Sequence, residues 1–307
     1  AKLLSGVRER IARVEVNEGF SASNPDFSSV VVPAAMDRVA LGVYLDGELR
    51  RHVTRAREAQ LVVFSGLKLE KLSDLEGILR RSQVRMVLAA GSLATALKKA
   101  EADLDGYEFS LGKVGDLQHS HEKYHIPPDR IAQAARMLQA GRAQGVEFVL
   151  PVDFVLADGR VAERIPPDGQ QLDVGPKTSE LFERKIGEFI AWHREHRQQT
   201  GRPALAFHNG VFGKFEDPRF ESATRRFMTQ LKRLHDAGVE VYVGGGEGGA
   251  ALDKYGQPDW VTHTFTAGGT ILKALGTEGI PYLKAMWMAV QRQQGESRPT
   301  KRKEKGG

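Results

Sequence analysis

The feature that most constrains this chain is a repeated unit in which a short apolar run, most often ending in glycine, precedes an amphipathic stretch. These runs predict strands over residues 61–66, 85–91, 147–157, 203–210, 239–246 and 260–269. The first, second, fourth and fifth are nearly continuous apolar segments, which is typical of parallel strands covered on both faces. The alternation with helical segments predicts an α/β fold: a doubly wound, Rossmann-like parallel sheet with three layers, α/β/α.

The segments between the runs have helical periodicity. They predict helices over 129–143, 178–198 and 221–237, with Thr178 as the N-cap of the second and Gly238 ending the third. Residues 37–57 are predicted as one long helix that leads into the sheet as a connector. The body of the chain, residues 58–286, is therefore interpreted as one doubly wound domain.

Composition excludes several classes of protein. The 307 residues include no cysteine, which rules out disulfides, thiolate catalysis and cysteine metal sites. No apolar run reaches the roughly 18–20 residues that a membrane span needs. The first residues lack the apolar core of a secretory signal, so we expect a cytoplasmic protein without a membrane span.

The positive charge is concentrated at one end. Residues 291–307 carry six lysines and arginines against two glutamates, so they account for four of the five net positive charges. The body is near neutral, and nucleic-acid binding is not expected except through this tail. Residues 287–307 are interpreted as a basic, disordered end. Docking of the tail on RNA, membrane phosphate or an acidic partner stays open as the alternative.

Residues 243–250, VGGGEGGA, follow a predicted strand and precede a predicted helix. Consecutive glycines let backbone N–H groups approach an anion, and the start of a helix adds its positive dipole. A single loop of this kind is equally compatible with a plain turn. Glycines after two further strands, at 208–210 and 267–269, favour the phosphate-binding interpretation, because strand ends meet at one crevice.

Six segments, taken in order, resemble the carboxyl-terminal half of phosphoglycerate kinase. They are SGLK (65–68), LPVDFVLAD (150–158), LDVGPKT (172–178), HNGVFGKFE (208–216), VGGGEGGA (243–250) and HTFTAGG (263–269). VNEGFSAS (16–23) is similar to a stretch near the end of that family's amino-terminal domain. The resemblance covers about residues 1–286 and implies two Rossmann-like domains, of which the first binds 3-phosphoglycerate and the second binds MgADP or MgATP.

The resemblance also implies a domain organisation and residue roles. Residues 1–36 would be a remnant of the amino-terminal domain, 37–57 the hinge helix and 58–286 the nucleotide-binding domain. Glu216 would accept hydrogen bonds from the ribose, and Glu247 would stand where the family positions the Mg²⁺-bound phosphates. The nucleotide would further contact Lys68, Asn209, Gly210, Gly268 and Gly269, and the transferring phosphoryl group would meet Gly244, Gly245 and Gly246.

Several positions depart from the family pattern. Most of the amino-terminal domain is absent, and with it the arginines and the histidine that would bind phosphoglycerate. Leu72 replaces a second lysine, although Lys71 is adjacent. Ala89 and Ala90 replace two glycines, and their methyl groups are expected to crowd a purine. Glu247 is longer than the family's aspartate, and Gly248 lacks the expected hydroxyl.

Two functions follow from these matches and departures. One is a phosphoglycerate kinase, or its nucleotide-binding portion, in which a chain or segment supplies the amino-terminal domain. The other is a catalytically inactive scaffold that keeps the fold and uses its basic tail for an acidic partner. The departures count against phosphoryl transfer by this chain alone, while nucleotide binding is expected to be retained.

The remaining polar clusters are interpreted as structural. The segment 118–125 contains His119, His121, Glu122 and His125, a set that zinc could use, but its surroundings favour a polar loop. His208 and His263 are predicted as core or crevice residues on buried strands. Asp153 and Asp158 are predicted to be structural rather than an acid–base pair.

Overall fold

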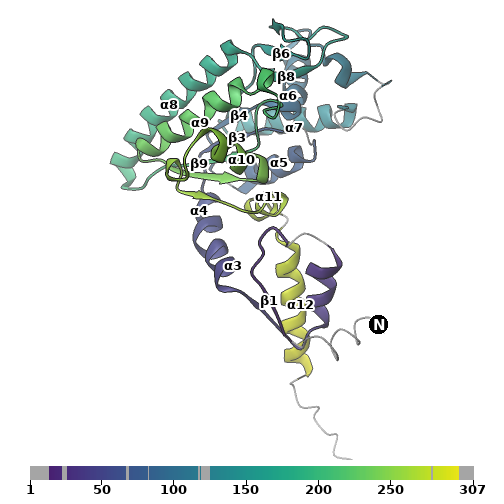
Figure 1. Ribbon diagram of the computed structural model, residues 1–307, viewed down its shortest axis with the longest axis vertical. Coiled ribbons are helices and arrows are strands. Elements are labelled where there is room, and N and C mark those ends of the chain that lie inside the picture. Colours follow the sequence, from purple (N-terminus) through teal and green to yellow (C-terminus); the bar gives the residue numbers. More distant parts are fainter. Residues whose placement is uncertain are drawn as a thin grey trace, which may run out of the picture. The chain divides into compact units, whose positions relative to one another are not determined.

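The computed structural model describes residues 14–22, 26–66, 69–81, 83–116, 118, 125–277 and 279–296. The chain divides into two compact units, one formed by Ala1–Arg51 with Glu278–Gly307 and the other by His52–Thr277. Figure 1 shows the elements of both units. The strand ends singled out by the sequence belong to the second unit, which is described first.

The second unit contains a six-stranded parallel sheet with the strand order β11-β10-β9-β3-β4-β5. The strands are β3 (Leu61–Phe64), β4 (Met86–Ala89), β5 (Glu147–Val149), β9 (Leu205–Asn209), β10 (Glu240–Gly244) and β11 (His263–Thr264). The chain runs outward from β3 to β5 and then returns to β9 on the other side of β3. This order confirms the doubly wound parallel sheet, and the direction of winding switches between β3 and β9.

Helices cover both faces of the sheet. Alternate strand residues such as Leu61 and Val63 share one core with α8 (Pro176–Thr200), α9 (Ser222–Asp236) and α10 (Gly246–Tyr255). Figure 1 shows α8 and α9 side by side. The opposite strand residues, including Val62 and Phe64, are also buried. Helices from the first half of the winding lie on that face: α5 (Lys71–Arg81), α6 (Gly91–Asp105) and α7 (Pro128–Ala143), with α11 (Gly269–Leu275) packed on α5.

A second, antiparallel sheet accounts for one wrong prediction. The run 147–157 is not one strand: it divides into β5 and β6 (Phe154–Leu156), and β6 pairs with β7 (Val161–Ala162) and β8 (Gln171–Val174). The division falls at Pro151, which has no N–H to give to a ladder.

Two more boundary predictions are wrong. The strand predicted over 260–269 is reduced to β11. The first residue of the predicted range belongs to the 3-10 helix η6 (Pro258–Trp260), and its last residue is the first of α11. Thr178 is not the N-cap of α8, whose cap is Gly175 and which begins with Pro176. Thr178 is the third residue of the helix, in its first turn, where its hydroxyl donates to the Asp153 carboxylate at 2.7 Å. Two other 3-10 turns are η3 (Gly112–Gly115) and η5 (Pro218–Phe220).

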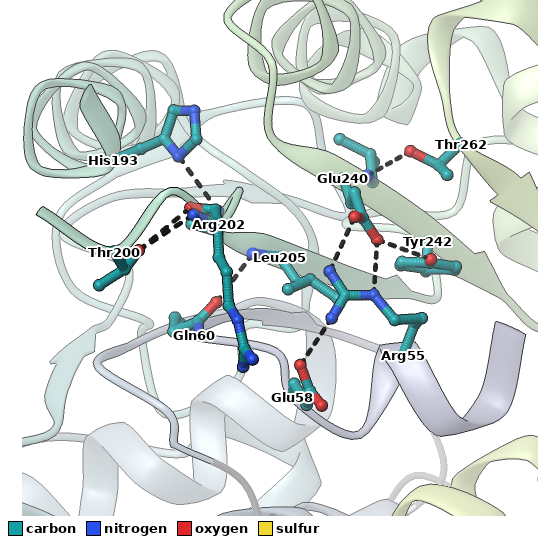
Figure 2. Close-up of polar contacts among 12 residues, drawn as sticks. Arg55, Glu58, Gln60, His193, Thr200, Arg202, Leu205, Glu240, Tyr242 and Thr262 are labelled. Atoms are coloured by element: carbon teal, nitrogen blue, oxygen red, sulfur yellow. Dashed lines mark hydrogen bonds and ion pairs between the residues drawn. The ribbon is translucent and has the colours of Figure 1, made fainter. Parts of the chain in front are cut away.

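The amino edge of the six-stranded sheet is closed by side-chain hydrogen bonds (Figure 2). Arg55 donates to both carboxylate oxygens of Glu240, at 3.2 and 2.8 Å, and the Tyr242 hydroxyl donates to the same carboxylate at 2.9 Å. The Gln60 side chain accepts from the backbone N–H of Leu205 at 2.8 Å. These contacts join α4 (Thr54–Ala56) and the start of β3 to the starts of β9 and β10.

The first unit overturns the prediction of one helix over 37–57. Strand β2 (Arg38–Leu41) pairs in parallel with β1 (Val14–Asn17), and helical structure begins only after Gly42. Glu18 supplies the reason, because its carboxylate accepts from the backbone N–H groups of Tyr44 and Leu45 at 2.9 and 3.2 Å. A carboxylate in this place caps a helix start. The helix then runs through α3 (Val43–Gly47), η2 (Glu48–Val53) and α4.

The carboxyl-terminal helix α12 (Pro281–Glu296) belongs to the first unit and packs on η1 (Phe27–Val31) and α2 (Val32–Ala35). Arg292 donates to the carbonyl of Met36 at 2.9 Å. Residues 287–296 of the predicted basic tail therefore lie in this helix, and the rest of the tail lies outside the described residues. Among the helices of the described residues, none is both long and apolar enough to cross a membrane.

Candidate functional site

The candidate site lies at the carboxyl ends of β3, β9 and β10, next to the switch in winding direction. Parallel pairing sets Phe64 opposite Asn209 and Asn209 opposite Gly244. The Asn209 side-chain amide donates to the carbonyl of Gly244 at 2.8 Å. Asn209 is 2% exposed, and its Oδ1 has no hydrogen-bond partner among the described residues. A buried carbonyl oxygen without a partner calls for a donor from water or a ligand.

The glycine loop between β10 and α10 contains glycines of two kinds. Gly244 packs against the Phe207 ring, which would lie 2.9 Å from an added Cβ. Gly245, the N-cap of α10, has φ +90°, a conformation that L side chains rarely adopt. Gly246 has neither constraint, since an added Cβ would meet no atom of the described residues within 4 Å. The open position faces solvent, where a ligand could approach the backbone.

The start of α10 is suited to an anion. This helix has ten residues, and its first-turn N–H groups have no carbonyl within the helix to bind. The first turn also holds Glu247, whose side chain is exposed. A carboxylate here is stabilised by the helix dipole but repels a phosphate, so the two are compatible when a cation lies between them.

The ends of β3 and β9 fit closely against each other. Gly210 has φ +96°, and an added Cβ would lie 2.2 Å from the carbonyl oxygen of Ser65. The Ser65 N–H donates to the Asn209 carbonyl at 2.9 Å, and the Ser65 hydroxyl donates to the carbonyl of Val211 at 2.8 Å. Glycine at 210 is therefore required by the backbone itself.

A lysine that sequence reasoning left undecided lies at this strand end. Lys71, the first residue of α5, donates its ammonium to the Ser65 carbonyl at 2.7 Å. Leu72 is fully buried, because one step along a helix turns a side chain toward the core. Burial and, second, the charge of Lys71 lower the pKa of His208 to about 3, so that imidazole is neutral. Lys68 lies outside the described residues.

The end of β4 is packed inside the protein. Ala89 and Ala90 are fully buried. Gly91, with φ +67°, starts α6 so close to β3 that an added Cβ would lie 2.8 Å from the Gly66 carbonyl oxygen. The two alanine methyl groups thus fill protein interior.

The loop after Gly210 carries Glu216, which is exposed in a turn. Two backbone contacts hold the loop in place: the N–H of Phe212 donates to the Thr224 hydroxyl at 3.1 Å, and the N–H of Lys214 donates to the carbonyl of Leu172 at 2.8 Å. Glu216 is therefore presented on a fixed backbone.

A buried carboxyl group that the sequence did not single out lies under the same loop. Asp173 is fully buried, and its carboxylate accepts from the backbone N–H groups of Val174 and Ala223 at 2.9 and 3.2 Å. Burial raises its pKa to about 7, more than the two hydrogen bonds lower it. Gly213 packs directly on it, since an added Cβ would lie 2.5 Å from the carboxylate. Its position in the LDVGPKT segment was the available signal.

The last predicted glycines follow the edge strand β11. Gly268 is the N-cap of α11 and Gly269 is its first residue. In the part of the chain that the structure describes, an added Cβ at either would meet no atom within 4 Å. With seven residues, α11 offers a weaker dipole than α10. These two positions resemble Gly246 in leaving the backbone open.

The other predicted polar residues have structural roles where the structure describes them. Asp153 accepts from the backbone N–H groups of Lys177 and Thr178 at 3.0 and 2.7 Å, which confirms it as a structural carboxylate at the start of α8. Asp158 is exposed and pairs with Arg160. His263 stacks on His52 with ring centroids 3.7 Å apart. Of the histidine-rich segment, His119, His121 and Glu122 lie outside the described residues.

The structure thus brings together Asn209, Gly210 and residues 244–246, while Lys71, at the start of α5, donates to the Ser65 carbonyl at the end of the adjoining strand. A family model described as phosphoglycerate kinase matches residues 7–278. The chain belongs to the phosphoglycerate kinase family. This confirms the resemblance on which the residue roles were predicted; the roles themselves stay predictions.

Known relatives extend beyond this chain. A probable phosphoglycerate kinase of Caenorhabditis elegans is 28% identical over 293 residues, which cover 90% of this chain and 62% of the relative. Phosphoglycerate kinase of Saccharomyces cerevisiae is 27% identical over 287 residues, which cover 88% of this chain and 61% of the relative. The chain therefore spans less than two thirds of the length of these relatives.

Two solved structures support the fold. Phosphoglycerate kinase from Coxiella burnetii superposes with a TM-score of 0.67 at 22% identity, covering 96% of this chain and 69% of the other. The enzyme from Pyrococcus horikoshii gives 0.69 at 22% identity, covering 92% and 66%. Together with the strand order, they confirm the three-layer α/β fold.

Proposed function

We propose that the unit His52–Thr277 binds MgADP or MgATP at the carboxyl edge of its six-stranded sheet. The observation that carries the proposal is the glycine loop, which leads from β10 into the start of α10 beside the unpartnered Oδ1 of Asn209. The phosphates would lie over Gly244, Gly245 and Gly246, with Lys71 at the start of α5 as a cation beside the end of β3. The match to the phosphoglycerate kinase family supports a nucleotide as the ligand.

The donor set fits Mg²⁺ held jointly with phosphate. Mg²⁺ prefers oxygen ligands and is bound in such sites by one or two carboxylates together with substrate phosphates. Glu247 offers an exposed carboxylate in the first turn of α10 and would hold the ion. When bound, the ion would neutralise charge that develops on the phosphoryl oxygens. Glu216, Gly210, Gly268 and Gly269 would complete the nucleotide contacts, as the family resemblance implies.

We further propose that the chain supplies the nucleotide-binding half of a phosphoryl transfer between 1,3-bisphosphoglycerate and ADP. The family supports this reaction, while the chain spans about 62% of the curated relative from C. elegans. Holding two substrates in line can supply about 7–11 kcal/mol of the barrier. Turnover would therefore need a chain or segment that provides the phosphoglycerate-binding domain.

Calorimetric titration tests the nucleotide site. Gly246→Val places a branched side chain in open space at the start of α10, so we expect the fold to persist and MgADP affinity to fall at least about tenfold. Gly47→Val is the matched control, because Gly47 is also helical and open. Wild-type protein that takes up no MgADP at millimolar concentration would refute the proposal. A coupled assay with 3-phosphoglycerate and MgATP then measures turnover by the chain alone.

A further inference from the structure

The last turn of α10 makes contacts that the nucleotide proposal does not use. Lys254 and Tyr255 are its final two residues, and both reach across to the start of α9. The Tyr255 hydroxyl donates to the Glu221 carboxylate at 2.7 Å, and the Lys254 ammonium donates to the same oxygen at 3.2 Å. Lys254 also donates to the backbone carbonyl of Phe215 at 3.3 Å. The Tyr255 hydroxyl lies 3.5 Å from that carbonyl.

The carbonyl that they hold belongs to the residue immediately before Glu216. Phe215 is largely buried, and Lys254 lies over its ring with 5.7 Å between the ammonium and the ring centroid. The backbone at Phe215 is therefore held both by the hydrogen bond to its carbonyl and by the burial of its ring. Glu216 follows directly and is exposed, so this anchored backbone fixes the position from which its side chain extends.

The same helix begins at the proposed phosphate loop. With ten residues, α10 is about 15 Å long at 1.5 Å per residue. Its first residues form the glycine loop, and its last two hold the loop that carries Glu216. One rigid element thus fixes the distance between the proposed phosphate end and the proposed ribose end of the site.

We propose that Lys254 and Tyr255 are positioning residues that aim Glu216 at the ribose of the bound nucleotide, an inference that rests on the proposed function. Hydrogen bonds from both side chains lower the pKa of Glu221, which keeps this carboxylate ionised as their common acceptor. Neither residue needs to touch the nucleotide. Their effect is to remove freedom from the loop before the ligand arrives.

Two ligands separate positioning of the ribose loop from general damage. MgADP carries a ribose, whereas inorganic tripolyphosphate with Mg²⁺ offers phosphates alone. We expect Tyr255→Phe and Lys254→Met each to weaken MgADP about fivefold and to leave tripolyphosphate affinity unchanged within about twofold. Glu216→Gln should show the same pattern. In a double variant with Glu216→Gln, Tyr255→Phe should weaken MgADP binding little further, because both substitutions act through the contact between Glu216 and the ribose.

The chain contains a matched control. Lys98, Glu101 and Tyr107 form the same kind of triad away from the site: Tyr107 donates to Glu101 at 2.7 Å and Lys98 pairs with it at 2.8 Å. Tyr107→Phe should leave both affinities at the wild-type value. Hydrogen exchange of the backbone amides in residues 213–217 gives a readout without ligand, and it should speed up in Tyr255→Phe and not in Tyr107→Phe.

The outcomes separate the two proposals. Wild-type protein that binds neither ligand removes the nucleotide site and this inference together. Wild-type binding of MgADP with a Glu216→Gln defect, but with no defect in Tyr255→Phe or Lys254→Met, overturns the inference alone. Equal loss of MgADP and tripolyphosphate in the two variants also overturns it, because that pattern reports a merely structural role.

Discussion

At the amino edge of the sheet the Glu240 carboxylate accepts hydrogen bonds from the Arg55 guanidinium and the Tyr242 hydroxyl (Figure 2). At the carboxyl edge, by contrast, Asn209 buries an oxygen that has no partner among the described residues. Both edges belong to the same strands. At the amino edge these side chains hydrogen-bond within the protein, whereas the carboxyl edge keeps an unpartnered acceptor near the open backbone of Gly246.

The two edges of the sheet therefore have different roles. Polar groups that hydrogen-bond to one another contribute to the stability of the fold, while unsatisfied groups at a strand end are available to bind a ligand. Changes at the amino edge should therefore alter stability, and changes at open positions of the carboxyl edge should alter binding. The predictions below test this division, starting with the largest effect.

The largest expected effect is the pH dependence of stability that comes from Asp173, near the carboxyl edge. Burial disfavours the charged form of its carboxyl group. Its pKa is raised from 3.8 to about 7 in the folded chain. The unfolded state thus binds fewer protons between these values, so the free energy of unfolding should fall as pH rises from about 4 to 7 and level off above. The contribution is on the order of 3–4 kcal/mol.

Urea unfolding across this pH range measures the effect. Asp173→Asn should remove this part of the pH dependence, so the stability difference between variant and wild type should change steadily between pH 4 and 7. Asp236→Asn, at an exposed carboxylate that pairs with Lys232, is the control. Parallel pH curves for wild type and Asp173→Asn would show that Asp173 titrates at its ordinary value.

Gly210→Ala tests whether the junction of β3 and β9 requires glycine. The positive φ and the 2.2 Å approach to the Ser65 carbonyl predict a loss of at least about 3 kcal/mol in unfolding free energy. Gly145→Ala has a positive φ without any neighbour within 4 Å, so it should cost about 1 kcal/mol. Equal losses of unfolding free energy for the two variants, measured by denaturant unfolding, would mean that the close approach of Gly210 to the Ser65 carbonyl contributes nothing.

Arg55→Met tests the amino edge. Loss of the partly buried pair with Glu240 should lower unfolding free energy by about 1–2 kcal/mol, while MgADP affinity stays unchanged. Arg50→Met is the matched control, since the Arg50–Asp46 pair is exposed to solvent and should contribute little to stability. Weaker MgADP binding by Arg55→Met would contradict the assignment of stability to the amino edge and of binding to the carboxyl edge.

Much of the fold was accessible from the sequence because local signals agreed with the tertiary structure. The apolar runs of β3, β4, β9 and β10 are covered on both faces, so their pattern alone predicts them. The run 147–157 was wrongly predicted as one strand because its apolar character continues through Pro151. The strand partner changes there, from β4 for β5 to β8 for β6. The helix predicted over 37–57 failed because β1 pairs with residues 38–41, a contact that local periodicity cannot reveal.

The candidate site was predictable in its glycines and less so in its charged groups. Strand ends with glycine can be located from the sequence, and parallel pairing then brings Asn209 beside Gly244. Lys71 depends on how α5 begins, since a rotation of one residue would exchange it with Leu72. Asp173 and Tyr255 are distant in sequence from the loop that they support. The LDVGPKT segment is a sequence signal for Asp173, but its contact with the loop, like that of Tyr255, follows only from tertiary packing.

Hydrogen exchange with and without MgADP measures both edges of the sheet in one experiment. We expect added protection in residues 209–217 and 244–250 and unchanged exchange at the amino edge, in residues 203–206. Absence of added protection at the glycine loop, or protection confined to the amino edge, would contradict the claim that the carboxyl edge of this sheet is a nucleotide site.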